Sequence, residues 1–109
     1  MIQACAPMIY SATSMRERMR GLLGRTHLPT GEALYIKPCR AIHTLFMKFP
    51  IDVRFYNKRG ELVKEILDVK PGCWFVWGGW RAHGVLESMA GDKTFQGLEH
   101  LPSIKTKEK

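Results

Sequence analysis

Alternation of apolar and other side chains predicts a β-hairpin in the middle of the chain. Ile51, Val53 and Phe55 occupy every second position, which is typical of a strand with one buried face. Residues 57–60, with the sequence NKRG, have the composition of a turn whose glycine accepts a positive φ. Residues 61–70 are therefore predicted to return as the second strand of the hairpin.

Further strands are predicted on both sides of this hairpin. Residues 2–10 are mostly apolar, residues 33–36 form a short apolar run, and residues 81–89 place alternate side chains on one face. Residues 95–101 are predicted to form one last short element. The chain is therefore expected to contain five or six strands with short connections.

A periodicity typical of a helix occupies residues 14–24. Ser14 and Glu17 have the spacing of a capping box, in which the two side chains satisfy backbone N–H groups of the first turn. One apolar stripe follows, formed by Met15, Met19, Leu22 and Leu23. We therefore predict a mainly β (α+β) fold, a compact, strongly curved, barrel-like sheet of five or six strands with one N-terminal helix packed against it.

Length and composition indicate one small domain. The chain has 109 residues, of which 45% are hydrophobic and 25% charged, and these are ordinary globular values. We assign residues 1–103 to a single domain and residues 104–109 to a basic, disordered tail. No apolar run reaches the roughly 18 residues that a membrane helix needs. The first residues lack the basic region of a secretory signal, so we expect a cytoplasmic protein with no membrane partner.

The positive net charge indicates anionic partners. Seventeen Lys and Arg residues against ten Asp and Glu residues give a net charge of +7, of which the tail contributes only a small part. Such a surplus attracts anionic small molecules, acidic proteins and nucleic acids. We expect an anionic small molecule or an acidic partner, and we keep nucleic acid as a less favoured partner.

Three sequence blocks resemble a known family. They are RMRGLLGR at residues 18–25, HTLFMKFPIDV at residues 43–53 and VLESMAG at residues 85–91. In this order and spacing they are similar to domain-of-unknown-function family 192, a set of small prokaryotic proteins. The resemblance implies a compact, mostly β domain with a helix near the N-terminus and with no established activity. The third block departs from the family, because ESMAG replaces the more usual ELPAG.

The same blocks contain more charged and small residues than packing requires, and they supply the preferred candidate site. We expect a cleft between the predicted helix, the 43–52 segment and the strand of the third block. Arg20 and Lys48 would attract an anionic group in this cleft. The candidate ligand-binding residues are Arg20, Gly21, His43, Lys48, Asp52 and Glu87. The preferred function is a small, non-catalytic binding module with a cleft for an anionic or polar ligand.

A small enzyme is the first alternative. A hydrolase or lyase could use His43 with Asp52 or Glu87 for acid–base catalysis, because an imidazole and a carboxylate can exchange protons near neutral pH. The competing explanation is structural. The two carboxylates could instead pair with Lys48 or Arg20 and stabilise the fold.

Binding of nucleic acid through a basic and tryptophan-rich surface is the second alternative. Residues 74–80 contain three tryptophans, and Arg81 follows them. Aromatic rings beside cations can stack on a sugar or a base, although large aromatic side chains also fill cores. Trp77, Trp80 and Arg81 are therefore second-rank candidates for ligand binding.

The sequence predicts neither a metal site nor a cofactor. Its four histidines and three cysteines do not form paired C-x-x-C or H-x-x-x-H motifs. The glycine-rich loops that bind phosphate or dinucleotides are also absent from the sequence. The cysteines are expected to be free thiols that behave as small apolar residues.

Overall fold

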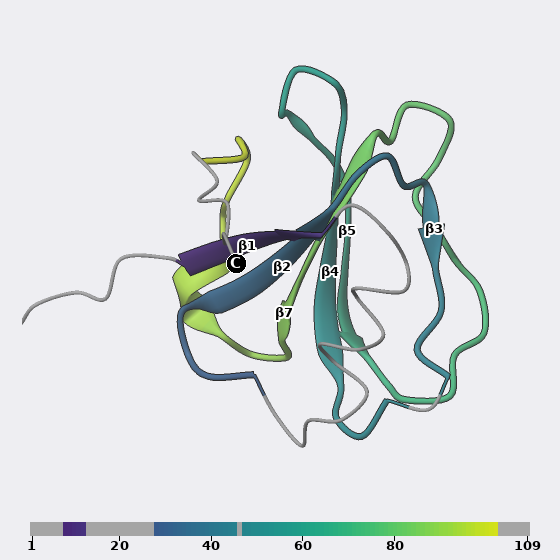
Figure 1. The fold of residues 1–109 in the computed structure, drawn as a ribbon, viewed down its shortest axis with the longest axis vertical. Coiled ribbons are helices and arrows are strands. Elements are labelled where there is room, and N and C mark those ends of the chain that lie inside the picture. Colours follow the sequence, from purple (N-terminus) through teal and green to yellow (C-terminus); the bar gives the residue numbers. More distant parts are fainter. Residues whose placement is uncertain (1–7, 13–27, 46, 103–109) are drawn as a thin grey trace, which may run out of the picture.

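The computed structural model describes residues 8–12, 28–45 and 47–102, and these residues form two β-sheets. The larger sheet has the strand order β1-β2-β7-β4-β5, and the smaller pairs β3 with β6 (Figure 1). The strands are β1 (Met8–Ala12), β2 (Glu32–Ile36), β3 (Ala41–Ile42), β4 (Ile51–Tyr56), β5 (Leu62–Val69), β6 (Val76–Trp77) and β7 (Gly84–Met89). β1 runs parallel to β2, and the other paired strands are antiparallel.

The inner strand β4 is buried on both faces. Its residues Ile51, Val53 and Phe55 belong to one core cluster, as the alternation of the sequence predicts. Tyr56 belongs to a second cluster on the opposite face, together with Leu86 of β7. A strand whose two faces both lie in cores fixes the register of its neighbours, because a one-residue slip would exchange the two faces.

The larger core lies between the five-stranded sheet and the β3–β6 pair. Ile42 of β3 and Val76 of β6 are buried in the same cluster as Phe55 and Val85. Figure 1 shows the β3–β6 pair standing apart from the main sheet beside β4 and β5. The small sheet therefore covers one face of the large one, and the segment that follows β6 is held at the end of the core.

The second core is covered by the C-terminal part of the described chain. The short 3-10 helix η1 (Lys93–Phe95) places Phe95 in this cluster. Tyr56 donates a hydrogen bond of 2.8 Å from its hydroxyl to the Leu98 carbonyl, and the Leu101 N–H donates to the Gly60 carbonyl at 2.7 Å. These bonds attach residues 98–101 to the ends of β4 and β5.

The predicted fold class is wrong in the shape of the sheet. The five strands form an open sheet with edges at β1 and β5, because no ladder joins these two strands and closes a barrel. Within the described ranges the only helix is η1, so the described residues are mainly β and not α+β. The helix predicted for residues 14–24 lies outside the described residues. None of the described helices is long and apolar enough to cross a membrane.

Candidate functional site

Two carboxylates of the first candidate site project from opposite faces of the sheet. Asp52 of β4 lies opposite Ser88 of β7, whereas Glu87 lies opposite Val53. Directly opposed residues project from the same face, and successive residues alternate between faces. Asp52 and Glu87 are both buried, at 2% and 0% exposure, and they do not share a cleft.

Asp52 uses both carboxylate oxygens to hold the backbone. Oδ1 accepts the Asp68 N–H at 2.8 Å, and Oδ2 accepts the Gly91 N–H at 3.0 Å. Asp68 and Gly91 have φ angles of 55° and 85°, so both acceptors fix residues in the left-handed region. These contacts make Asp52 a structural anchor for the end of β5 and for the turn after β7.

The remaining described residues of this site are a loop histidine and a lysine. His43 is half-buried in the loop after β3, and Lys48 is exposed. Arg20 and Gly21 lie outside the described residues. The described members are thus an exposed cation, a half-buried imidazole and two buried carboxylates on opposite faces.

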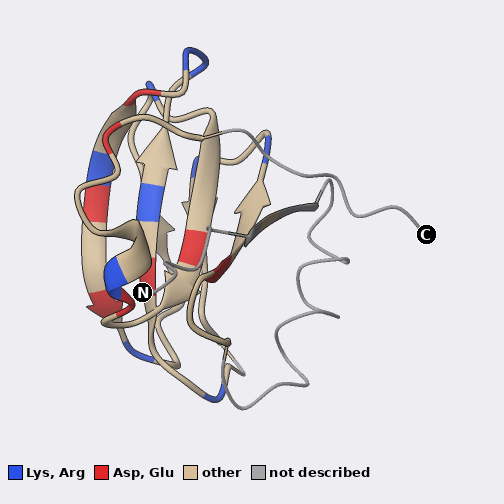
Figure 2. Ribbon diagram, turned by 90° about the vertical axis from the view of Figure 1, so that its left-hand side faces the viewer, with Lys and Arg blue, Asp and Glu red and all other residues tan. Residues whose placement is uncertain are grey.

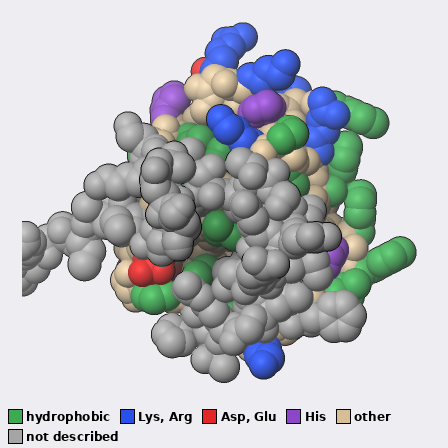
Figure 3. Space-filling view, viewed as in Figure 1, with side chains coloured by type: hydrophobic (Ala, Val, Ile, Leu, Met, Phe, Trp, Pro, Cys, Tyr) green, Lys and Arg blue, Asp and Glu red, His purple; other side chains and the backbone are tan. Residues whose placement is uncertain are grey.

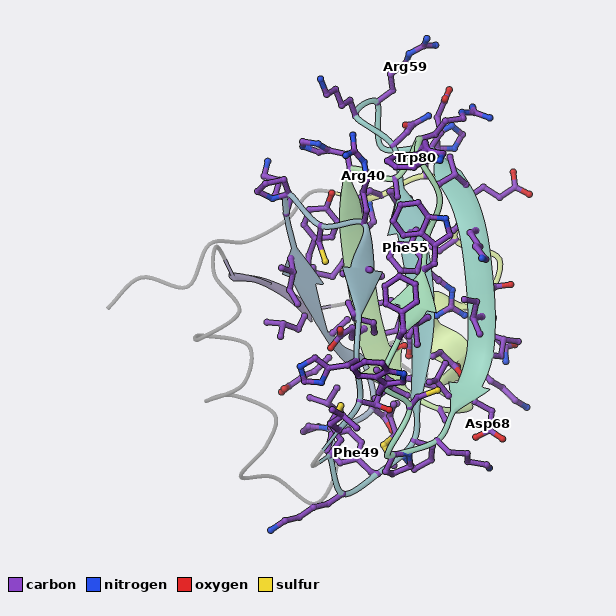
Figure 4. All side chains as sticks on the ribbon, turned by 90° about the vertical axis from the view of Figure 1, so that its right-hand side faces the viewer. Arg40, Phe49, Phe55, Arg59, Asp68 and Trp80 are labelled. Carbon is purple, nitrogen blue, oxygen red and sulfur yellow. The ribbon has the colours of Figure 1, made fainter. Side chains whose placement is uncertain are left out.

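A basic cavity lies at the other end of the sheet from Asp68. It has a volume of about 420 Å³ and is named here the basic pocket. Its lining residues are Arg40, Asn57, Lys58, Arg59, Glu61, Trp80, Arg81, Ala82 and His83. Figure 4 places Arg59, Arg40 and Trp80 at one end of the molecule and Asp68 at the other. In the basic pocket, four Lys and Arg side chains face a single carboxylate.

A smaller cavity continues from the basic pocket. It has a volume of about 290 Å³ and shares Arg40, Ala82 and His83 with its neighbour. Pro38 and Cys39 complete its lining. Figure 3 shows Lys, Arg and His side chains gathered at this end of the molecule. The two cavities therefore form one concave region with positive charge.

The turn between β4 and β5 forms one wall of the basic pocket. Asn57 accepts hydrogen bonds from the N–H groups of Arg59 and Glu61 on its side-chain oxygen, both at 2.9 Å. Gly60 has a φ of 80°, as the turn sequence predicts. This hydrogen bonding fixes the turn that carries Lys58 and Arg59, which Figure 2 shows as a blue tip beyond the sheet.

The segment between β6 and β7 forms the opposite wall. The Gly78 N–H donates to the Arg40 carbonyl at 2.7 Å, and the His83 N–H donates to the Tyr56 carbonyl at 2.7 Å. The His83 carbonyl in turn accepts the Cys39 N–H at 2.8 Å. Three backbone hydrogen bonds thus hold this segment against the end of β4 and beside Arg40.

Gly78 allows the backbone of this wall to lie directly on the core. A Cβ atom at Gly78 would stand 2.3 Å from Cδ1 of Phe55, so only glycine fits there. Phe55 itself is 0% exposed. Figure 4 shows Phe55 below Trp80, so the tryptophan stands over the end of the packed sheet.

Exposed aromatic rings extend away from the basic pocket. Trp80 contacts Trp77 edge to face, with ring centroids 5.0 Å apart, and Trp77 stacks on Phe75 at 6.2 Å. Trp80, Trp74 and Phe75 are 78%, 77% and 62% exposed. We name Trp74, Phe75, Trp77 and Trp80 the aromatic ridge. Such exposure is not explained by packing of the core.

Arg40 joins the ridge to the basic pocket. Its guanidinium carbon lies 5.9 Å from the centroid of the Trp80 ring, within the range of a cation–π contact. A hydrogen bond from Asn57 is the main cause that holds the pKa of Glu61 below its usual range. Desolvation opposes it, and the charges of Arg59, His100 and Arg81 lower the pKa by smaller amounts. The one carboxylate of the pocket therefore stays ionised at neutral pH.

The sequence identified only part of this region. Trp77, Trp80 and Arg81 were predicted as second-rank ligand-binding residues, whereas Arg40, Lys58 and Arg59 were not predicted to belong to a site. The predicted NKRG turn at residues 57–60 was the feature of the sequence that could have indicated a role for Lys58 and Arg59. Arg40 reaches the region because Gly78 pairs with it beyond the β3–β6 ladder.

Comparisons with known proteins identify the family and the fold. A family model, DUF192 (Uncharacterized ACR, COG1430), matches residues 6–100. The structure is similar to that of a protein of unknown function from Novosphingobium aromaticivorans DSM 12444, with a TM-score of 0.66 and 20% identity over 74% of this chain. The match spans 61% of that protein's length. No curated protein matches the chain.

A second solved structure shares the same fold. It is a proposed transcription regulator from Sinorhizobium meliloti 1021, with a TM-score of 0.69 and 18% identity. The match covers 83% of this chain and 72% of that protein. At such low identities both neighbours support the fold and leave the activity of this chain open.

Proposed function

We propose that this chain, which belongs to the DUF192 family, is a non-catalytic binding module whose basic pocket takes an anionic ligand that carries a flat ring. One observation carries the proposal. The Arg40 guanidinium lies over Trp80 at a cavity where four cations face one carboxylate. The preferred function from the sequence is retained, but its site moves from the Asp52 region to this end of the sheet.

The chemistry of the lining residues fits such a ligand. Guanidinium groups form paired, charge-assisted hydrogen bonds with carboxylates and phosphates. Trp80 offers a large exposed ring, on which a flat group can stack while its anionic part contacts Arg40 or Arg59. A volume of about 420 Å³ also suits a small molecule or one unit of a longer chain.

The hydrogen bonding of the region favours binding over catalysis. The Cys39 thiol donates to the Ala41 carbonyl at 3.1 Å, which stabilises the neutral thiol and not the nucleophilic thiolate. Glu61 accepts a hydrogen bond from the Asn57 side chain at 3.0 Å and has a lowered pKa, which is unsuited to a general acid at neutral pH.

Tryptophan fluorescence tests the proposal. The protein is titrated with adenosine 5′-monophosphate, with adenosine and with inorganic phosphate at low salt. We expect the nucleotide to bind more tightly than either of its parts, because only the nucleotide engages both the ring and the cations. Arg40→Gln should weaken nucleotide binding about tenfold, the scale of one charge-assisted contact.

Lys48→Gln is the matched control. It removes the same charge from an exposed position next to Phe49, which Figure 4 places at the opposite end of the molecule. We expect it to leave the affinity unchanged. Equal weakening by the two substitutions would mean that the binding reflects net charge alone, and the basic pocket would not be the site.

A further inference from the structure

We propose that the basic pocket and the aromatic ridge together bind a single strand of nucleic acid, with its bases on the rings and its phosphates on the flanking cations. The inference rests on the proposed function of the basic pocket and extends it to a ligand class. It uses the part of the exposed surface that a mononucleotide would leave uncovered.

The ridge is longer than the pocket. Trp80 is the only ridge residue that lines the basic pocket among the described residues, whereas Trp77 and Phe75 continue from it through successive ring contacts. Trp74 adds a further ring that is 77% exposed. A ligand with one flat group would occupy one ring. Three exposed rings, two of them joined by the half-buried Trp77, suit a ligand that repeats its flat groups, as single strands do.

Cations accompany the ridge at Trp80 and at Trp77. Arg40 lies over Trp80, and Lys64 of β5 donates from its ammonium to the Trp77 carbonyl at 2.7 Å. Lys58 and Arg59 stand beyond Trp80 on the β4–β5 turn. Figure 3 shows the blue side chains meeting the protruding hydrophobic ones at the upper edge of the molecule. This combination of rings and cations is the one that sequence-independent single-strand binding uses.

An apolar cavity below the ridge is the main argument for a protein partner. Its volume is about 410 Å³, and Ile66, Leu67 and Val69 of β5 line it with Phe75 and Trp77. A protein that covered this cavity and the ridge would also have to approach Arg40 and Lys58 near Trp80. A polyanion satisfies these cations directly, so we favour nucleic acid and use the apolar cavity as a control.

Fluorescence anisotropy of labelled oligonucleotides tests this inference with the full chain. Single strands of about twelve nucleotides, the scale of such sites, are compared with the duplex of the same sequence and with adenosine 5′-monophosphate. We expect the single strand to bind at least about tenfold more tightly than the mononucleotide, because it occupies several rings. The duplex should bind more weakly than the single strand, because its bases are stacked on one another. Parallel titrations with oligo(dT) and oligo(rU) distinguish DNA from RNA.

Salt dependence and variants separate the contacts to phosphates from the contacts to bases. Four phosphate contacts predict a slope of about −3 for the logarithm of affinity against that of salt concentration. Trp80→Ala and Phe75→Ala should each weaken binding by about fivefold to 100-fold with the slope unchanged. Lys58→Gln should reduce the steepness of the slope by about 0.7. Leu67→Ala, in the apolar cavity, should have no effect, and circular dichroism checks that each variant is folded.

Four outcomes would overturn the inference. If heparin, a polyanion without bases, bound as tightly as the oligonucleotide, the rings would not contribute. If the mononucleotide bound as tightly as the oligonucleotide, the proposed function of the pocket would stand and the strand would be excluded. If Leu67→Ala weakened binding as much as Trp80→Ala, the surface would be an apolar docking site for protein. Absence of binding by both nucleotide and oligonucleotide would overturn the proposed function as well.

Discussion

The Asp52 carboxylate accepts the backbone N–H of Gly91 at 3.0 Å and thereby joins β4 to the turn that follows β7. Its other oxygen accepts the N–H of Asp68 at the end of β5. A buried acceptor with two backbone donors stabilises the fold, because each amide would otherwise lose a partner away from water. Asp52 was a candidate for ligand binding and acid–base chemistry, and these contacts assign it a structural role.

Replacement of Asp52 should therefore reduce stability and not ligand affinity. We expect Asp52→Ala to lower the free energy of unfolding by about 3 kcal/mol, and Asp52→Asn, which retains one acceptor, by roughly half as much. Urea denaturation measures both changes. A stable Asp52→Ala protein that had lost nucleotide binding would return Asp52 to the binding site.

Removal of the Glu61 charge should strengthen anion binding. Glu61→Gln keeps the acceptor for the Asn57 amide but deletes the one negative charge among the cations of the basic pocket. We expect the affinity for adenosine 5′-monophosphate to rise about twofold to fivefold at low salt, since exposed charges interact weakly through water. The gain should shrink as salt increases.

Asp68→Asn is the control for this experiment. It makes the same change in net charge at the opposite end of the molecule, where Figure 4 places Asp68. Asparagine also tolerates the left-handed φ of 55° at this position. An equal gain from Asp68→Asn would show that Glu61 acts through net charge and not through the pocket.

A side chain at Gly78 should destabilise the fold where the segment of the aromatic ridge packs on Phe55. We expect Gly78→Ala to cost about 2 kcal/mol, because its Cβ would overlap the Phe55 ring in a well-packed core. Phe55→Leu alone should cost about 1 kcal/mol, but the double variant should be less destabilised than the sum of the two changes. Thermal melts of the four proteins measure this coupling. Strict additivity would contradict the contact.

Stability should fall in alkaline solution through Tyr56. Burial, as the main cause, raises the pKa of Tyr56 from 10.0 to about 12, although the charge of Arg54 opposes the shift. The folded state therefore keeps the proton more tightly than the unfolded state. The resulting stability is complete below pH 10 and is lost as the pH rises from 10 to about 12.

Tyr56→Phe separates this effect from general alkaline denaturation. It removes the hydrogen bond to the Leu98 carbonyl and should cost about 1 kcal/mol at neutral pH. Its stability should then decline less than that of the wild type between pH 10 and pH 12. Parallel declines in urea titrations across this interval would exclude Tyr56 as the cause.

Removal of Glu65 alone should reduce stability, whereas removal of both Arg54 and Glu65 should not. Arg54 is 0% exposed, and its Nε donates to Glu65 at 2.8 Å, while its Nη2 has no hydrogen-bond partner among the described residues. Glu65→Ala should therefore cost about 2 kcal/mol, because it removes the acceptor of the buried Arg54 Nε, and the partial exposure of Glu65 keeps the cost below that of a fully buried pair. Arg54→Met in the same background should restore stability, as urea denaturation would measure. Failure to restore it would mean that Arg54 contributes chiefly through packing.

Local patterns predicted the strands that have a strong periodicity. Alternation identified β4, and the NKRG turn identified the hairpin with β5. The predicted strand 81–89 began too early, because the Ala82 N–H donates to the Gly79 carbonyl in a turn before β7. The two-residue strands β3 and β6 were missed, since they have no period of their own and exist only through pairing with each other.

Tertiary arrangement accounts for the error in the fold and for the residues of the basic pocket that the sequence did not indicate. Whether a sheet closes depends on its two edge strands, and no local pattern in β1 or β5 indicated that they stay apart. The family-like blocks directed attention to Asp52, but its hydrogen bonds could be known only from the structure. Arg40 and Trp80 are distant in sequence and meet because of the β3–β6 pairing.

The position of β7 has a consequence for biosynthesis. β7 comes after the other strands in the chain, yet it lies between β2 and β4 in the sheet. Until residues 84–89 leave the ribosome, the pairs β1–β2 and β4–β5 have no hydrogen bonds to each other, and the apolar faces of β2 and β4 stay open to water. The chain is therefore expected to complete its fold in one late, cooperative step, and an emerging chain that lacks β7 would be a substrate for chaperones.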